Sequence, residues 1–213
     1  MKLKMDERNY SGKLIVFCGL DGCGKTTLIH KTCEYLSNRS YEVLLTKQPT
    51  SEMRKNHIFR VYQDQEDKEN YDYRALSLLA ASDRLQHNKS VIIPALFQGK
   101  TVVSDRYFYS CLANLRARGY ENDLWIYDIA KKIPLPNLSF FLDIEVEEAI
   151  RRVRKRPDEK DRYIDVELQY RLRESYLKIA KTVGGVVIPT NNTADISFEV
   201  VRHHIDKLLD ESR

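Results

Sequence analysis

The sequence contains one contiguous motif whose residue types and spacing indicate phosphate chemistry. Residues 19–26, GLDGCGKT, match the pattern G-x-x-x-x-G-K-[ST] in full. Glycines let backbone N–H groups curl around phosphate oxygens, and the helix that follows adds the positive end of its dipole. We expect Lys25 to reach the β- and γ-phosphates of a nucleoside triphosphate, and the hydroxyl of Thr26 to bind Mg²⁺. The alternative, a glycine turn with a solvated lysine, is disfavoured because a strand-like run precedes the motif and a helical pattern follows it.

Two other positions could handle a second phosphate. Asp105 and Arg106 directly follow the apolar run 100–104, so the carboxylate can face Lys25 and the arginine can hold a phosphate. Arg84 lies on a predicted helix at 73–88. Taken alone, these residues also fit an ion pair at a strand end and an exposed helix arginine.

A dense basic run lies between residues 151 and 162. It contains Arg151, Arg152, Arg154, Lys155, Arg156, Lys160 and Arg162. Charge runs usually form solvated helix faces, but the density of this one favours a flexible lid that neutralises transferring phosphate when it closes. A nucleic-acid patch is the alternative, and it is disfavoured because no aromatic residues interleave with the run.

Apolar runs of strand length alternate with helical patterns along the chain. Strands are predicted at 13–18, 42–46, 100–104, 139–144 and 186–188, and helices at 25–39, 73–88, 91–98, 108–118, 121–133, from 146, at 165–182 and from 193. Residues 47–73 are predicted to be irregular. This alternation predicts an α/β fold with a doubly wound, five-stranded parallel sheet and helices on both faces. Ligands of such sheets bind at the carboxyl ends of the strands, where the polar motifs fall.

The composition fits one ordinary globular domain. Of 213 residues, 42% are apolar and 31% charged, which excludes disorder and a disulfide scaffold. We expect a single domain over 1–213, with a flexible polar leader at 1–12 and the lid at 151–163. The net charge of +4 is too small to predict nucleic-acid binding, and no apolar run is long enough for a membrane span or signal peptide. The four cysteines lack CxxC or zinc spacing, so reduced thiols and a cytoplasmic location are expected.

Taken together and in order, these features resemble the thymidylate kinase family of P-loop nucleoside monophosphate kinases. The matching segments are GLDGCGKTT (19–27), TKQP (46–49), SDRLQH (82–87), DRY (105–107), PNLSFFLD (136–143) and DRY (161–163). The resemblance implies ATP-dependent phosphoryl transfer to a nucleoside 5′-monophosphate, most readily dTMP, with Mg²⁺ as cofactor. It also implies a homodimer. Because the oxygen of the acceptor phosphate is already anionic, no general base is needed, and catalysis reduces to alignment and charge neutralisation.

The resemblance assigns roles residue by residue. It places ATP at Gly19, Gly22, Cys23, Gly24, Lys25, Thr26, Thr27 and Arg152, and the metal at Thr26 and Asp105. The catalytic set is Lys25, Asp105, Arg106, Arg156 and Arg162. The acceptor set is Asp21, Lys47, Ala80, Arg84, Arg106, Tyr107, Ser110, Cys111 and Asn114. With Gly22 in place of a P-loop arginine, the chain resembles the bacterial-type arrangement, which keeps its catalytic arginine in the lid.

The departures from the family pattern matter more for the choice of substrate than for the reaction. Lys47 stands where the family has an arginine, and a lysine keeps the charge but cannot make the bidentate contact with phosphate. Ala80 stands where the family has an aromatic residue that stacks on thymine. Asn114 and Leu115 replace an aromatic and a polar residue near the sugar and base. Aromatics such as Tyr73, Phe108 or Tyr109 could fill the space, or the enzyme could accept a different or modified nucleoside monophosphate. A third hypothesis is a P-loop module that switches or drives a partner, but the sequence has no N-K-x-D motif for reading guanine.

Overall fold

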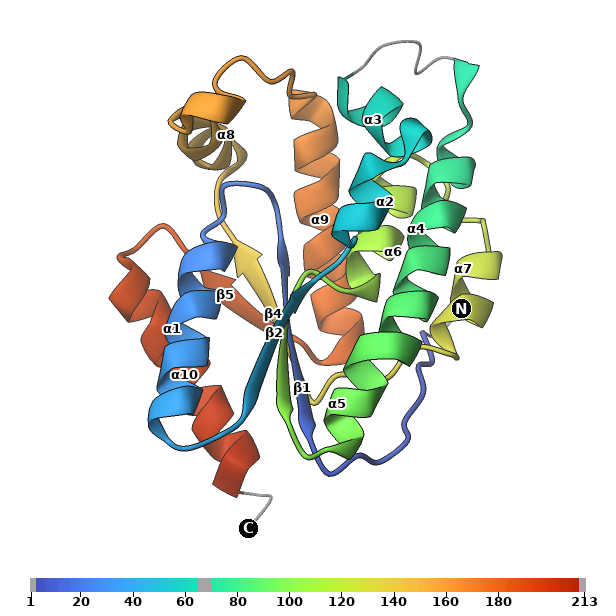
Figure 1. Cartoon of the computed structure of the whole chain (residues 1–213). Helices are drawn as coiled ribbons and strands as arrows, with labels where there is room; N and C mark the ends of the chain where they lie inside the picture. The colour runs from blue at the N-terminus through green and yellow to red at the C-terminus, as the bar shows by residue number, and fades with distance from the viewer. Residues whose placement is uncertain (1–2, 65–69, 211–213) are drawn as a thin grey trace.

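A five-stranded parallel sheet forms the centre of the protein, as the sequence predicts. The computed structural model describes residues 3–64 and 70–210. The strands lie in the order β2-β3-β1-β4-β5 (Figure 1). Their bounds are β1 Lys13–Gly19, β2 Val43–Lys47, β3 Thr101–Asp105, β4 Leu138–Asp143 and β5 Val186–Pro189. Each agrees with a predicted strand to within one residue at either end, because buried parallel strands are continuous apolar runs.

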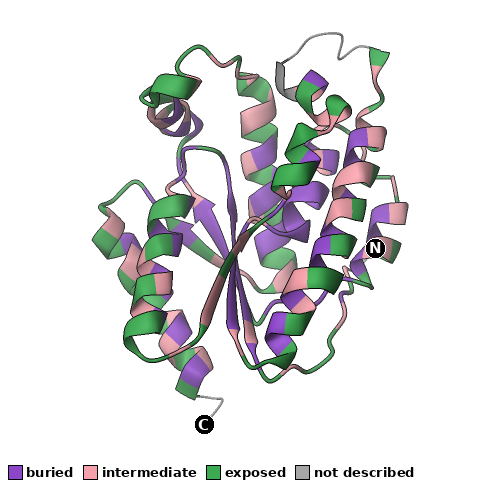
Figure 2. Cartoon of the chain, viewed as in Figure 1, coloured by how far each residue is buried: buried purple, intermediate pink, exposed green. Residues whose placement is uncertain are grey.

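The central strands are buried on both faces. Ile15 of β1 lies opposite Val103 of β3, and Phe17 lies opposite Phe140 of β4. All four side chains are fully inaccessible to solvent, and Figure 2 shows buried residues concentrated in the sheet and on the helix surfaces that face it. This core fixes the positions of the carboxyl ends of β1 and β3, from which the candidate site is built.

Helices cover both faces of the sheet. On one face, α1 Lys25–Asn38 packs beside α10 Ala194–Asp210. On the other face lie α4 Tyr73–His87, α5 Ile93–Phe97, α6 Phe108–Ala117 and α9 Val166–Val183 (Figure 1). The α9 helix starts where the Asp165 side chain accepts a bond from the Leu168 N–H at 2.9 Å and ends at Gly184 in the left-handed region.

Three predicted segments differ from the structure. Residues 47–73 are not wholly irregular, because α2 Ser51–Lys55 and α3 His57–Asp64 lie there, while residues 65–69 are outside the described part of the chain. The helix predicted at 121–133 is reduced to α7 Trp125–Ala130. The helix predicted at 91–98 joins α4 through a π-helical turn, η2 Asn88–Ile92.

Thr50 explains the first difference. Its side chain caps α2 by accepting from the Met53 N–H at 3.3 Å, and its own N–H donates to Asp83 of α4 at 3.0 Å. A helix of five residues has no stability of its own. It exists because this cap and the contact with α4 hold it, and neither is visible as periodicity.

The N-terminal segment lies against the body of the protein. Met5 is 7% exposed, the Asp6 N–H donates to the Ile133 carbonyl at 2.9 Å, and the Leu135 N–H donates to the Asp6 carbonyl at 2.7 Å. Tyr10 makes an edge-to-face contact with Phe97. Within residues 3–64 and 70–210, none of the helices is both long and apolar enough to cross a membrane.

Candidate active site

The glycine-rich loop joins β1 to α1 and is held closely against α8 Val146–Arg154. Gly22 has φ +84°, and a Cβ at this position would lie 2.2 Å from the Ala149 carbonyl oxygen. Only glycine fits this backbone and this approach. The loop at 19–24 therefore has the shape that its sequence predicts.

Lys25 lies buried beneath the loop. Its Nζ donates to the carbonyl of Leu20 at 2.6 Å and to that of Gly19 at 3.2 Å, and Cys23 Sγ lies 3.6 Å away. Backbone carbonyls are weaker partners for an ammonium than phosphate oxygens are. A bound phosphate can therefore replace these carbonyls as the hydrogen-bond partner of Lys25 at little cost in free energy.

Asp21 joins the loop to two arginines. Its Oδ1 accepts from Arg106 at 2.5 Å, and its Oδ2 accepts from Arg162, in the basic segment before α9, at 3.1 Å. Partial desolvation raises the pKa of the carboxyl, but the charges of Arg106, Lys25 and Arg162 outweigh it and hold this pKa well below its usual range. The aspartate is therefore ionised at all physiological pH values and keeps both guanidinium groups beside the loop.

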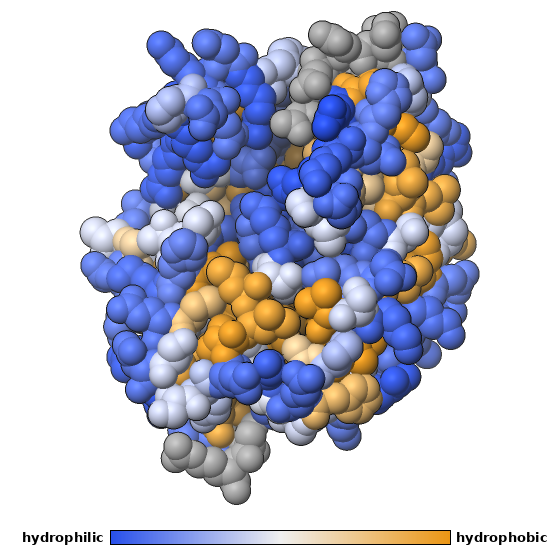
Figure 3. Space-filling model, in the orientation of Figure 1, coloured by the Kyte–Doolittle hydropathy of each residue, from blue (hydrophilic) through white to orange (hydrophobic). Residues whose placement is uncertain are grey.

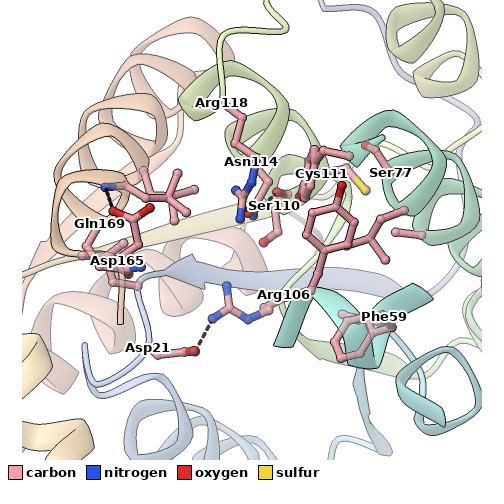
Figure 4. Close-up of a pocket in the computed structure, with 18 of the residues that line it drawn as sticks. Asp21, Phe59, Ser77, Arg106, Ser110, Cys111, Asn114, Arg118, Asp165 and Gln169 are labelled. Carbon is pink, nitrogen blue, oxygen red and sulfur yellow. Dashed lines mark hydrogen bonds and ion pairs between the residues drawn. The ribbon is translucent and has the colours of Figure 1, made fainter. Parts of the chain in front are cut away.

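Arg106 follows β3 and is held from three sides. Figure 4 shows its contact with Asp21. Besides Asp21, its NH1 donates to the Gly19 carbonyl and to the Tyr176 hydroxyl, each at 3.1 Å. Its backbone adopts φ +66°, in the left-handed region. Tyr176, on α9, donates in turn to Ser110 Oγ at 3.1 Å, and burial raises the pKa of Tyr176 to about 12 in spite of Arg106. The phenol is therefore neutral and can serve Arg106 as an acceptor.

Asp105 presents a carboxylate oxygen at the end of β3. Its Oδ2 pairs with Lys47 Nζ at 2.9 Å, while its Oδ1 is buried and has no hydrogen-bond partner among the residues that the structure describes. Thr26 lies exposed in the first turn of α1. One carboxylate and one hydroxyl are hard oxygen donors, and they fit a Mg²⁺ ion that takes its other ligands from phosphates and water. Among the described residues there is no cluster of three His, Cys, Asp or Glu side chains that would hold a metal without phosphates.

A pocket of about 350 Å³ extends from the loop to the space between α4, α6 and α9 (Figure 4). It brings together a large part of the predicted acceptor set, namely Asp21, Ala80, Arg84, Arg106, Ser110, Cys111 and Asn114, together with Gly19 and Arg162. Arg84 is 2% exposed and donates to the carbonyls of Ala80 and Tyr107 at 2.8 and 3.4 Å. The pocket therefore has a cationic end beside the loop and a mixed polar and apolar end beside Ala80.

Eleven predicted residues are not in the described lining of this pocket, namely Gly22, Cys23, Gly24, Lys25, Thr26, Thr27, Lys47, Asp105, Tyr107, Arg152 and Arg156. Tyr107 is fully buried, and its hydroxyl donates to the Pro134 carbonyl at 2.9 Å. Arg152 donates to Glu148 and to the Thr190 carbonyl, Arg156 pairs with Glu159 at 2.9 Å, and Lys47 pairs with Asp105. Of the aromatics considered as a replacement at Ala80, Tyr73 lines the pocket, whereas Phe108 and Tyr109 are buried in the core.

Sequence reasoning missed several lining residues. They are Arg54 of α2, Phe59 and Tyr62 of α3, Arg118 after α6 and Tyr176 of α9. Partial desolvation and then the charge of Arg106 lower the pKa of Arg54. An isolated arginine or tyrosine carries no motif, so only the fold could place these side chains.

The sheet order, the loop between β1 and α1 and the arginines around it define a P-loop phosphotransferase site. The model of the thymidylate kinase family matches residues 17–201. A protein from Pyrococcus horikoshii named "Probable thymidylate kinase" is 41% identical over 172 residues, covering 80% of this chain and 83% of its own length. A "Thymidylate kinase" from a Sulfurihydrogenibium species is 34% identical over 204 residues, covering 94% and 98%. The chain belongs to the thymidylate kinase family, which confirms the resemblance found in the sequence.

Proposed function

We propose that this protein transfers the γ-phosphoryl group of ATP to the 5′-phosphate of dTMP, giving dTDP and ADP. The observation that carries this proposal is the continuity of the pocket. It runs from the phosphate-binding loop, past Arg106 and Arg162 on Asp21, to a nucleoside-sized space beside Ala80. Two phosphate chains entering from opposite ends would meet at these arginines.

The chain's own residues supply alignment and charge. We infer that Lys25 moves from the carbonyls of Gly19 and Leu20 onto the transferring phosphate, and that Arg106 neutralises the oxygens between donor and acceptor. Thr26 and Asp105 would hold Mg²⁺, which when bound offsets charge on the phosphate chain of ATP. No side chain is required as a general base, because the attacking oxygen is already ionised.

The basic segment 151–163 is proposed to act as a lid. Arg162 contacts both Asp21 of the loop and Glu159 of the same segment, at 3.1 and 2.7 Å. An arginine shared between loop and lid can follow the phosphates as the segment closes, and closure would exclude water as a competing acceptor. Arg156 and Arg152 would need to leave Glu159 and Glu148 before they could bind phosphate. The catalytic role of Arg156 and the ATP-binding role of Arg152 stay predictions. The single domain over 1–213 likewise stays a proposal.

The test is an assay of ADP release with MgATP and a panel of nucleoside monophosphates. Turnover with dTMP at least about tenfold above the other acceptors supports the proposal. Preference for another base would replace dTMP by a different acceptor, an alternative that the small side chain at Ala80 keeps open. Hydrolysis that no acceptor changes would contradict the kinase proposal.

We propose that the protein is a homodimer, as the family resemblance implies. We also propose that it is located in the cytoplasm. Apolar side chains gather on the face that carries β2 (Figure 3), where Leu45 of β2, Leu78 of α4 and Phe97 of α5 are 47%, 49% and 58% exposed. A second copy of the chain could cover this face. Light scattering after size exclusion should give twice the chain mass, and Leu78→Asp should shift the mass toward that of one chain. A wild-type protein with the mass of one chain would contradict the dimer.

A further inference from the structure

Tyr107 directly follows Arg106 in the chain, but its side chain lies in the core and not in the pocket lining. The hydroxyl donates to the Pro134 carbonyl at 2.9 Å, and Asn88 Oδ1 lies 3.3 Å from it. Burial raises the pKa of Tyr107 well above its ordinary value, so the phenol keeps its proton and remains a donor. The residue after Arg106 is therefore anchored at the far end of its side chain.

The backbone of Arg106 depends on its surroundings for its conformation. Its φ of +66° lies in the left-handed region, which a residue with a Cβ adopts only at a cost in free energy. Its N–H donates to the Phe17 carbonyl at 2.8 Å, and its own carbonyl accepts from Ser104 Oγ at 2.7 Å. A strained residue persists only while its neighbours hold it. Tyr107 is the neighbour on the C-terminal side, and its phenol provides the anchor there.

The N-terminal segment (residues 3–12) fixes the acceptor of the Tyr107 hydrogen bond. The Asp6 N–H donates to the Ile133 carbonyl at 2.9 Å, and the Asp6 carbonyl accepts from the Leu135 N–H at 2.7 Å. These two bonds lie on either side of Pro134, which pairs with Asp6 in a parallel bridge. Pro134 has no N–H, and its carbonyl takes no part in the bridge. That carbonyl is therefore left for the phenol of Tyr107.

Other contacts hold the N-terminal segment in the same place. Met5 is buried, and the Tyr10 ring meets the Phe97 ring edge-on, with ring centres 5.1 Å apart. Figure 1 shows the N-terminal end of the described chain beside α7. The family model begins its match at residue 17. A connection from this segment to the active site is therefore not part of what the family match describes.

We propose that Tyr107 is a positioning residue that holds Arg106 in its catalytic orientation, and that the N-terminal segment acts through it by fixing the Pro134 carbonyl. Loss of the phenol leaves this buried carbonyl without its donor and lets residue 107 shift. A small displacement of Arg106 would weaken its contact with the transferring phosphate more than it would weaken the binding of ATP. The proposal rests on the proposed function, because turnover reports the position of Arg106.

The first test compares Tyr107→Phe with Tyr109→Phe. Tyr109 is also buried and lies two residues further on, but its hydroxyl accepts from Ser139 Oγ at 3.5 Å. Kinetics are measured with MgATP and dTMP at a temperature at which thermal melting shows each variant to be folded. For Tyr107→Phe we expect kcat to fall about fivefold, with KM for ATP within about twofold of wild type. Tyr109→Phe should keep kcat within about twofold.

The second test repeats Tyr107→Phe in an Arg106→Ala background. If the phenol acts through Arg106, the change should alter kcat by less than about twofold there, because the side chain that it positions is gone. A merely structural loss would lower kcat by the same factor in both backgrounds. That result would overturn the proposal.

Asp6→Pro tests the part of the N-terminal segment, because it removes the N–H that donates to Ile133. Glu7→Pro places the same ring at the next, exposed position and is the control. We expect Asp6→Pro to lower kcat about threefold in the wild-type chain and less than about 1.5-fold in Tyr107→Phe, since both changes interrupt the same contacts. Glu7→Pro should leave kcat within about twofold. A threefold loss in both backgrounds overturns the role of the N-terminal segment.

The remaining outcomes are also decisive. A kcat of Tyr107→Phe within twofold of wild type, or an equal loss in Tyr109→Phe, overturns the role of Tyr107. If Tyr107→Phe does not fold, Asp6→Pro with and without Arg106→Ala replaces it, and an unchanged kcat or an equal loss in both backgrounds overturns the proposal. Wild-type protein that phosphorylates no nucleoside monophosphate overturns the proposed function instead.

Discussion

Removing the Arg106 side chain should separate catalysis from stability. The guanidinium contacts the loop carbonyl of Gly19, the Asp21 carboxylate and the Tyr176 hydroxyl at 2.5–3.1 Å. It is therefore held in place before any phosphate arrives. Loss of one such preorganised donor costs about 10²–10³ in kcat, or about 2.7–4 kcal/mol of transition-state stabilisation. We expect a fall of this size in both Arg106→Ala and Arg106→Gly.

The two variants should differ in stability, because residue 106 has φ +66°. The left-handed conformation costs a residue with a Cβ about 1–2 kcal/mol, whereas glycine loses about 0.5–1 kcal/mol more conformational entropy than alanine on folding. At the midpoints of these two ranges, the difference leaves Arg106→Gly more stable than Arg106→Ala by about 0.75 kcal/mol. If the two variants are equally active but differ in stability, the strain at residue 106 affects stability and not turnover. The left-handed backbone then serves to place the arginine side chain.

The assays are ADP release with MgATP and dTMP, and urea unfolding of both variants. A kcat for Arg106→Ala within tenfold of wild type would refute the catalytic role. An alanine variant as stable as the glycine variant would refute the argument from backbone strain.

Three other changes test separate parts of the account. Lys25→Ala should lower kcat by about 10²–10³ with an unchanged circular dichroism spectrum, and near-normal turnover would contradict the phosphate assignment. Tyr176→Phe removes an acceptor from Arg106 and should lower kcat by about three- to tenfold with KM for ATP unchanged; a change in KM alone would argue against a positioning role. Burial holds the pKa of His87 below the ordinary value for histidine of about 6.5, so the unfolded chain binds a proton first as pH falls, and folded stability should drop below about pH 6.5. Thermal melts at pH 7.5 and 5.5 should show a smaller drop in His87→Asn than in wild type or in His30→Asn, and equal drops would contradict this.

The sheet could be predicted from sequence because each strand is a short apolar run buried on both faces. The long helices α1, α4 and α9 were predicted for a similar reason, since their periodicity is strong. The short helices α2 and α3 were missed because tertiary contacts stabilise them. The bond from the Thr50 N–H to Asp83 joins residues 33 positions apart, and no local pattern reveals it.

The phosphate end of the site could be predicted because its residues are contiguous. The loop at 19–26 forms one motif, and Arg106 follows a strand directly. The nucleoside end is assembled from side chains of α3, α4, α6 and α9, which are far apart in sequence. Tyr176 and Arg118 come to line the pocket only when the helices pack. No local pattern selects them from the 13 tyrosines and 35 lysines and arginines of the chain.

A structure with ADP, Mg²⁺, dTMP and a planar metal fluoride between the two nucleotides tests the central claim most directly. We predict that Lys25 leaves the Leu20 carbonyl and that Arg106 contacts the fluorides, with the thymine beside Ala80. Nucleotides bound elsewhere, with Lys25 and Arg106 still on Leu20 and Asp21, would contradict it.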